Sequence, residues 1–203
     1  MSVMSNKGFH DAVKSRRSIY AISKDTNVSD ETIEQVIKHS VLHVPSAFNS
    51  QSARVVLLMR EQSDKLWSIV KEKLRPLVPA DNFSSTEAKV DSFGSGIGTV
   101  LFFEDQTVVE GLQKQFELYK DNFPIWSLQS TGMLQFTVWT ALEAEGLGAS
   151  LQHYNPLIDD EVKKQWDLPD SWRLMAQMPF GHPVAPAGEK EFSPIEDRFK
   201  IVK

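Results

Sequence analysis

The sequence predicts one domain of the α+β or α/β class built on a central sheet, and three observations carry that prediction. Its 203 residues suit a single domain over residues 1–203. A content of 41% hydrophobic and 24% charged residues is typical of a globular chain. Apolar residues at helical spacing come first along the chain, and short apolar strands separated by helices follow, which favours helices packed on a sheet.

The first half of the chain is expected to hold three helices and one buried strand. Residues 9–15 fit a short helix. Ser29 is suited to cap a second helix with apolar residues at helical spacing, and Pro45 closes it. The apolar run within residues 54–59 predicts a buried strand. Ser63 would cap a third, amphipathic helix that ends at two prolines.

The middle of the chain mixes clear and ambiguous patterns. Residues 79–88 fit a loop or a short helix. Residues 98–103 predict a second buried strand, and the acidic pair Glu104 and Asp105 after it is expected to form a solvated turn. Residues 107–119 favour another helix.

The longest helix is expected over residues 124–145. Its apolar residues, which include Phe136 and Trp139, spread around much of the circumference. A helix that is apolar on several faces is buried, either in the core of one subunit or at an interface between two. Gly146 and Gly148 suit its C-terminal cap and the turn that follows.

The last part of the chain returns to strands. Residues 149–153 predict a short strand, Asp159 starts a further helix, and residues 172–180 predict another strand. Three prolines, the first of them Pro183, leave the last twenty residues extended.

Composition narrows the classes of function. The net charge of −5 argues against general nucleic-acid binding, which depends on neutralising phosphates. The absence of cysteine excludes disulfides and thiol chemistry, so a redox role would need a bound cofactor. Residues 1–10 lack the apolar core of a secretory signal, and no run of 18 apolar residues would span a membrane. We therefore expect a cytoplasmic protein with neither a membrane nor a nucleic acid as partner.

Two patterns are weak candidates for sites. Gly94, Gly96 and Gly98 suggest a nucleotide loop, but the cluster precedes a strand and lacks the third glycine of the dinucleotide pattern, so a structural turn is expected. His39 and His43 stand four residues apart on a predicted helix, and two ligands alone do not make a zinc site. No metal centre is expected.

Three short segments are harder to explain by packing. The first, residues 16–18, offers two guanidinium groups and a hydroxyl that suit a phosphate. The second, residues 45–51, reads P-S-A-F-N-S-Q and offers amides suited to a ring with several donors and acceptors. The third, residues 148–156, ends a strand with a turn, where backbone N–H groups are free. Each segment alone is weak evidence for a binding site. Their order and spacing along the chain make the evidence stronger.

In this order the three segments resemble motifs of the nitroreductase family of FMN-dependent oxidoreductases, over nearly the whole chain. The R-R-S sequence is similar to the family's opening signature, and P-S-A-F-N-S-Q is similar to its P-S-S-x-N-x-Q-P motif. The G-L-G sequence at Gly146 is similar to a third motif. The resemblance implies an α+β fold of the nitroreductase type, with a central mixed sheet flanked by helices and a homodimer with a long buried interface helix.

The resemblance also implies where the FMN phosphate binds. Arg16 and Ser18 would hold it, in the manner of the family's Arg and Ser. A basic residue near the C-terminus would return to the same phosphate, and Arg198 is the first choice and Lys190 the second.

The flavin ring would be met by the other two segments, and the P-S-A-F-N-S-Q loop would come from the neighbouring subunit. A backbone N–H near Gln152 or His153 would meet flavin N5. Arg17 or Arg54 would place positive charge at the N1/O2 edge, and the sequence leaves both open. The remaining implied contacts are Pro45, Ser46, Ala47, Asn49, Gln51, Leu151 and Tyr154.

The implied activity is a ping-pong cycle in which NADH or NADPH reduces FMN and a nitroaromatic, quinone or similar acceptor is then reduced. No side chain is assigned as a catalytic acid or base. The motif reads P-S-A for P-S-S, and Ser52 and Ala53 replace a Pro-Trp pair. These traits look like a compact branch that includes fungal proteins linked to fatty-acid signalling and oxidative stress, with relatives in lactic bacteria. The alternative is a flavin-binding regulatory or stress-response protein with little turnover.

Overall fold

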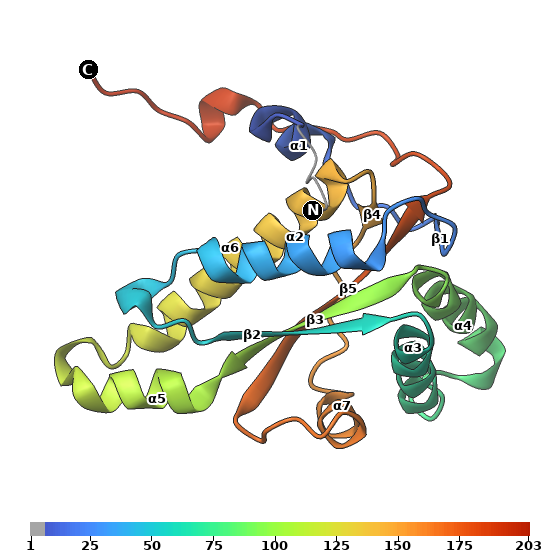
Figure 1. Cartoon of the computed structure of the whole chain (residues 1–203), viewed down its shortest axis with the longest axis horizontal. Helices are drawn as coiled ribbons and strands as arrows, with labels where there is room; N and C mark the ends of the chain where they lie inside the picture. The colour runs from blue at the N-terminus through green and yellow to red at the C-terminus, as the bar shows by residue number, and fades with distance from the viewer. Residues whose placement is uncertain (1–6) are drawn as a thin grey trace.

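Figure 1 shows the fold of the chain as a computed structural model, in which residues 7–203 are described. A five-stranded sheet lies at the centre and helices cover both of its faces, so the predicted α+β architecture with a central sheet is confirmed. The path of the sheet runs β1-β5-β3-β2, and β4 pairs with β5 off this path. The strands are β1 (Ile22–Ser23), β2 (Ala53–Met59), β3 (Gly98–Asp105), β4 (Gly148–Ala149) and β5 (Trp172–Pro183).

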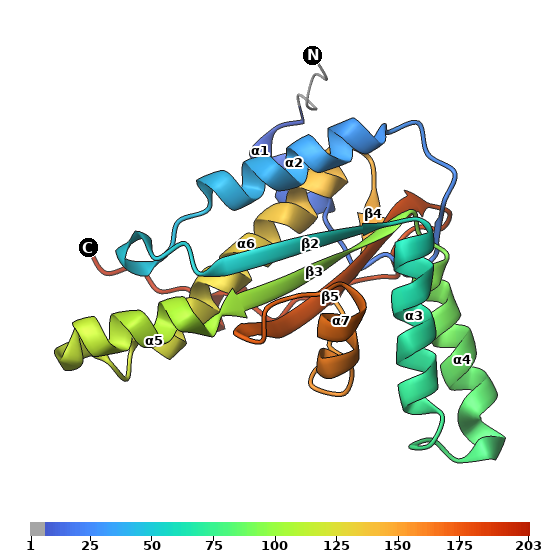
Figure 2. The same ribbon diagram turned by 60° about the horizontal axis from the view of Figure 1, so that its bottom comes forward.

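The sheet is almost wholly antiparallel. The ladders that join β2 to β3 and β3 to β5 run antiparallel, as do those of the two short strands with β5. The parallel component expected of a mixed sheet is confined, among the described residues, to an isolated bridge between Ser18 and Ala149. The reason lies in the connection after β2, where α3 and α4 form a helical hairpin (Figure 2). The hairpin returns the chain to the end of the sheet that it left, so β3 runs antiparallel to β2.

One face of the sheet is covered by α1 (Phe9–Ser15), α2 (Asp30–His43) and α6 (Phe123–Ala144). The Ser29 side chain accepts the N–H of Thr32, which confirms the predicted cap of α2. The long helix lies within one residue of its predicted limits, and Gly146 after it has φ +84°, as a left-handed cap requires. Part of α6 is buried in the core of this chain, whereas Ile125, Leu128, Met133 and Phe136 are exposed.

The other face is covered by α3 (Glu61–Leu74), α4 (Ala80–Gly94) and α7 (Asp159–Gln165). Side chains of β3 alternate between the two layers, so Val100 and Phe102 join the first core and Leu101 and Phe103 join the second. Two expectations need correction here. Ser63 lies inside α3, where its buried hydroxyl contacts that of Thr99 at 2.7 Å. The loop or short helix expected over residues 79–88 is part of the full helix α4.

The remaining short elements flank the sheet. The helix expected over residues 107–119 divides into α5 (Gln106–Gln115) and a 3-10 turn, η2 (Glu117–Tyr119). Further 3-10 turns are η1 (Ala47–Asn49) and η3 (Ile195–Asp197). The C-terminal segment is extended apart from η3, as predicted, and leads away from the body of the molecule (Figure 1). Its apolar side chains are exposed, namely Val184, Phe192, Ile195, Phe199, Ile201 and Val202.

Glu104 overturns the expected solvated turn. Its side chain is 1% exposed at the end of β3. The carboxylate accepts hydrogen bonds from Ser52 and Ser127, each at 2.6 Å, and from Thr131. The buried carboxylate therefore joins the start of β2 to the long helix α6, whereas Asp105 pairs with Arg54.

The weak motifs have structural explanations. A Cβ atom on Gly96 would lie 2.4 Å from the carbonyl oxygen of Phe180, so close backbone approach explains this glycine. The rings of His39 and His43 are 4.3 Å apart, and within residues 7–203 no group of three metal-ligating side chains forms.

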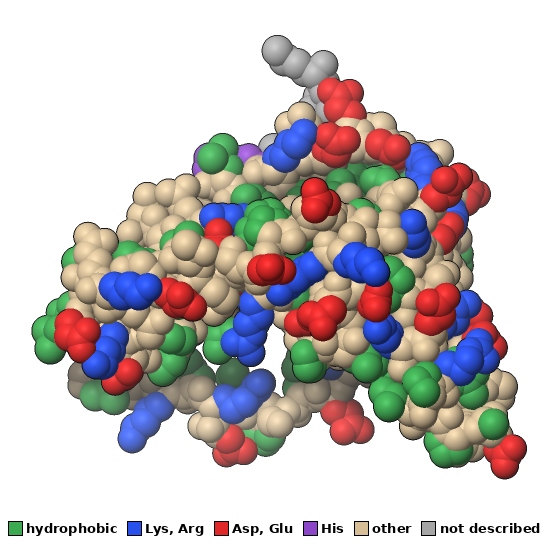
Figure 3. All heavy atoms as spheres, turned by 90° about the horizontal axis from the view of Figure 1, so that it is seen from below, with side chains coloured by type: hydrophobic (Ala, Val, Ile, Leu, Met, Phe, Trp, Pro, Cys, Tyr) green, Lys and Arg blue, Asp and Glu red, His purple; other side chains and the backbone are tan. Residues whose placement is uncertain are grey.

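None of the helices in the described part of the chain is long and apolar enough to cross a membrane. On the face seen in Figure 3, basic and acidic side chains are interspersed and do not gather by sign.

Candidate functional site

The basic pair and Ser18 line a cavity directly after α1. Arg16, Arg17 and Ser18 form one wall of this space of about 490 Å³, and residues 186–190 form another. Lys190 is part of the lining, whereas Arg198 is not. Three basic side chains and the single carboxylate of Glu189 leave this cavity positively charged. The structure thus brings together the first segment and the second-choice C-terminal residue.

Arg16 is held by packing and keeps free hydrogen-bonding capacity. Its guanidinium carbon lies 4.4 Å from the ring centroid of Trp139, in a cation–π contact. Its Nε is buried and has no hydrogen-bond partner in the described structure. Burial first, and then the charge of Arg17, lower the pKa of Arg16, while the carboxylate of Glu143 opposes them. A guanidinium stays charged under these conditions, so it is suited to an anion.

The third segment lies beside the first. The N–H of Ile19 donates to the carbonyl of Ala149 at 2.9 Å, which joins the chain after Ser18 to β4. A Cβ atom on Gly148 would lie 2.8 Å from a methyl group of Ile19, so only a glycine allows this close approach. After β4, the predicted strand over residues 149–153 continues as a bridge between Gln152 and Gln177 of β5.

The P-S-A-F-N-S-Q loop has a constrained backbone. Phe48, Asn49 and Gln51 have φ of 57°, 51° and 48°, a left-handed conformation that is uncommon for residues other than glycine. The Ser46 hydroxyl accepts the N–H of Gln51 at 2.9 Å and so closes the loop. The half-exposed ring of Phe48 stacks on that of Trp126, with 5.9 Å between centroids and 18° between planes. The loop is therefore closed on itself and packed against one end of α6.

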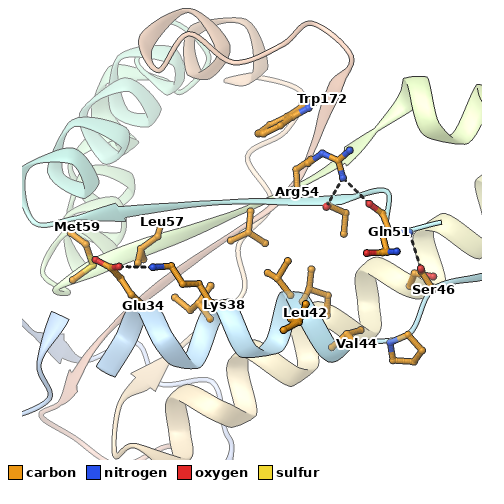
Figure 4. Close-up of a pocket in the computed structure, with 17 residues that line it drawn as sticks. Glu34, Lys38, Leu42, Val44, Ser46, Gln51, Arg54, Leu57, Met59 and Trp172 are labelled. Atoms are coloured by element: carbon orange, nitrogen blue, oxygen red, sulfur yellow. Dashed lines mark hydrogen bonds and ion pairs between the residues drawn. The ribbon is translucent and has the colours of Figure 1, made fainter. Parts of the chain in front are cut away.

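A groove runs from this loop along α2 and β2. It has a volume of about 850 Å³ and is lined mainly by apolar side chains (Figure 4). Arg54 lies at its rim, where it donates to the carbonyl of Gln51 at 2.7 Å and pairs with Asp105 at 3.0 Å. Its charge is therefore partly compensated. The predicted residues at this end of the groove are Pro45, Ser46, Gln51, Ala53 and Arg54.

The sequence-predicted residues form two groups that lie apart within one chain. Phe48 contacts α6 at Trp126, and Arg16 contacts it at Trp139. These two tryptophans are 13 residues apart in the helix, a spacing of about 20 Å. Arg16, Arg17, Ser18 and Lys190 belong to one end, with the Gln152 loop beside them, and residues 45–54 belong to the other.

Three residues that matter here were absent from the predicted site: Trp139, Gln177 and Glu104. Trp139 was expected only as an apolar helix residue, although it supports Arg16. Gln177 is fully buried in β5 between Ala176 and Met178, and Glu104 directly follows an apolar strand. A polar residue within or at the end of a continuous apolar run was the signal that could have singled out these two.

Comparison with known proteins identifies the fold. The model of the nitroreductase family matches residues 13–182. The chain belongs to the nitroreductase family. This family consists of oxidoreductases. The match confirms the resemblance that was inferred from the three motifs.

Three similar nitroreductase-family proteins cover nearly all of the chain. The nitroreductase CinD of Lactococcus lactis, solved in complex with nicotinic acid, is 48% identical with a TM-score of 0.90 over 97% of this chain and 100% of that one. CinD has also been solved with chloramphenicol and with 4-nitrophenol. HBN1 of Saccharomyces cerevisiae is 37% identical over 179 residues, 87% of this chain and 89% of HBN1. The yeast nitroreductase FRM2 is 32% identical over 184 residues, 90% and 91% of the two chains.

Proposed function

We propose that this nitroreductase-family protein is a homodimeric, FMN-dependent oxidoreductase that uses NADH or NADPH to reduce nitroaromatic, quinone or related acceptors in a ping-pong cycle. One observation carries the proposal. The residues that would hold FMN form two groups at opposite ends of α6, so that one chain supplies only part of a flavin site. The solved structure of CinD in complex with 4-nitrophenol supports a nitroaromatic as acceptor.

The cavity after α1 fits the phosphate of FMN. Its lining combines the guanidinium groups of Arg16 and Arg17 with the Ser18 hydroxyl and the Lys190 ammonium. The buried Nε of Arg16 has no partner in the chain, and a phosphate oxygen would satisfy it. We assign the phosphate to Arg16, Ser18 and Lys190. Arg198 of the same chain lies outside the cavity lining.

The ring of FMN would be met by backbone donors and positive charge. When bound, FMN supplies the hydride chemistry that no side chain of this protein can perform. A backbone N–H near Gln152 or His153 would donate to N5, in the segment that follows β4. Arg17 is the better candidate for the N1/O2 edge, because the charge of Arg54 is partly compensated by Asp105.

A second copy of the chain would complete the site. Three apolar surfaces of the chain could pack against a second copy. They are the exposed apolar side chains of α6, the groove along β2, and the apolar C-terminal segment. Phe136 of α6 is 40% exposed and Phe199 of the C-terminal segment is 63% exposed. Apolar surface on this scale is the usual mark of an interface between chains. The loop of residues 45–51 would then reach the flavin of the partner subunit.

The test is steady-state oxidation of NADH and of NADPH by the FMN-loaded protein with a nitroaromatic acceptor. Rapid turnover with parallel double-reciprocal lines supports the enzyme and its ping-pong order. Bound FMN with negligible turnover would contradict the proposal and favour a flavin-binding regulatory protein instead. A cytoplasmic location and a role in oxidative stress stay predictions.

A further inference from the structure

Gln177 is a buried polar residue whose hydrogen bonds all go to one loop. It is fully buried in β5, and its backbone exchanges hydrogen bonds of 2.7 and 2.9 Å with Gln152. Its side-chain Oε1 accepts the N–H of Tyr154 at 2.7 Å. Its Nε2 donates to Oδ1 of Asn155 at 3.3 Å. One residue of the sheet thus fixes residues 152–155 at three successive points.

These bonds determine which backbone N–H groups of the segment stay available. The N–H groups of Ser150, Gln152 and Tyr154 all point to β5, where they donate to Pro179 or Gln177. Because an extended chain alternates its N–H groups between two sides, those of Leu151 and His153 face the opposite side. Neither of them has a hydrogen-bond partner within residues 7–203. The carbonyl of Ala149 lies on the same side of the extended chain as these two N–H groups. It accepts the N–H of Ile19, so this side faces the segment that follows Arg16.

Burying the amide of Gln177 costs desolvation free energy, which its hydrogen bonds must offset. Its neighbours Ala176 and Met178 are apolar and fully buried, and an apolar residue of similar volume would fill the same space without desolvating an amide. The amide replaces the backbone partner that Tyr154 loses where the strand pairing ends. The alternation of N–H directions therefore continues to Tyr154, two residues beyond the last backbone pair at Gln152.

We propose that Gln177 is a positioning residue that holds the His153 N–H toward the flavin, and that this N–H is the one that donates to N5. The inference rests on the proposed function and deepens it, because the sequence left the donor open between Gln152 and His153. The N–H of Gln152 is occupied by the carbonyl of Gln177, which removes it as a candidate. Gln177 itself does not touch the cofactor.

The test compares the FMN-loaded wild type with Gln177→Met, which keeps the side-chain volume and removes both amide bonds. We expect amide hydrogen exchange at Tyr154 to accelerate at least tenfold, because its N–H loses its acceptor. We expect FMN to bind about tenfold more weakly. The midpoint potential of bound FMN should rise, because a donor at N5 pairs best with the oxidised ring.

Two variants make the comparison specific. Gln177→Asn keeps the amide, but its side chain is too short to reach Tyr154. We therefore expect faster amide exchange at Tyr154 and a higher midpoint potential of bound FMN in this variant too. It replaces Gln177→Met in the test if that variant fails to fold. Ile33→Ala creates a cavity under α2, and this matched loss of buried contacts should leave the potential of bound FMN unchanged.

The outcomes separate this inference from the proposed function. Faster exchange at Tyr154 with a raised potential supports the positioning role of Gln177. If Gln177→Met and Gln177→Asn keep the wild-type potential and FMN affinity, the role of Gln177 is wrong while the proposed function stands. A wild type that takes up no FMN overturns both.

Discussion

The guanidinium of Arg16 lies over the indole ring of Trp139, with 4.4 Å between the guanidinium carbon and the ring centroid. The indole covers one face of the cation, and the buried Nε of the guanidinium has no hydrogen-bond partner in the described structure. The long helix α6 therefore has a part in the proposed phosphate site, although none of its residues lines the cavity. A basic pair is usually a solvated surface feature, and this contact instead fixes the orientation of the Arg16 guanidinium.

Substitution of Arg16 tests the phosphate assignment. Arg16→Ala removes a charged hydrogen-bond donor, which is worth about 1.5–3 kcal/mol, so FMN should bind roughly ten- to hundredfold more weakly. The measurement is a fluorescence titration of the apoprotein with FMN. Lys14→Ala removes an exposed cation two residues away in α1, outside the cavity, and should bind FMN like the wild type.

The two C-terminal candidates provide a second comparison. Lys190→Ala should weaken FMN binding more than Arg198→Ala, because only Lys190 of this pair lines the cavity. The reverse order would mean that Arg198 reaches the phosphate by another route, such as the partner subunit. If Arg16→Ala, Lys190→Ala and Arg198→Ala all leave the affinity unchanged, the phosphate assignment is wrong.

Glu104 should contribute measurably to stability. Glu104→Ala leaves the hydroxyls of Ser52, Ser127 and Thr131 without their buried acceptor and opens a cavity. We expect a loss of about 2 kcal/mol and a melting temperature lower by about 4–8 °C. Glu104→Gln should cost less, because a hydroxyl can accept as well as donate. Glu110→Gln, at an exposed position of α5, is the control, and an equal effect of the two Gln variants would contradict this account.

Phe136 should be important for self-association. Phe136→Glu places a carboxylate on the exposed apolar side of α6, where burial against a second copy would be costly. We expect monomers in sedimentation equilibrium together with loss of FMN affinity, since the loop of residues 45–51 would no longer reach a partner. Leu77→Glu, an equally drastic change on the opposite layer, should leave the dimer intact. A Phe136→Glu protein that stays dimeric and keeps FMN would place the interface elsewhere.

The stability of the fold should depend on Asp159 in a pH-dependent way. Burial raises the pKa of Asp159, and Lys163 opposes this shift. A carboxyl with a raised folded-state pKa stabilises the fold below its ordinary pKa and loses that contribution as pH rises through the folded value. We therefore expect the free energy of unfolding of Asp159→Asn, relative to that of the wild type, to be higher at pH 7 than at pH 4. Denaturant unfolding of both proteins at the two pH values measures this difference. A difference that does not vary with pH would show that the carboxyl is not perturbed.

Local signals in the sequence were sufficient for most of the fold. The limits of α1 and the cap of α2 by Ser29 depend on residues within one or two turns, and both were predicted correctly. Ser63 was wrong as a cap because its hydroxyl is used by Thr99, which is 36 residues away. Glu104 was wrong as a solvated residue for the same reason, since its partners come from β2 and α6. The local sequence does not identify such long-range partners, although the position of Glu104 at the end of an apolar run is a sign of burial.

The candidate site was predicted in part. The three motifs named the residues that line the cavity after α1 and the loop at the groove, but not their separation within one chain. They ranked Arg198 above Lys190, whereas Lys190 lines the cavity and Arg198 does not, because that outcome depends on the path of a segment that is almost without regular structure. That residues 1–203 form a single domain stays a prediction.

The central claim is that two copies of the chain hold FMN between them. The most direct measurement is the absorption spectrum of the purified protein, taken together with its sedimentation and with the FMN content released on denaturation. The account predicts a yellow dimer that carries one FMN per chain. A colourless protein that takes up no added FMN, or a monomer that binds it at full affinity, would contradict it.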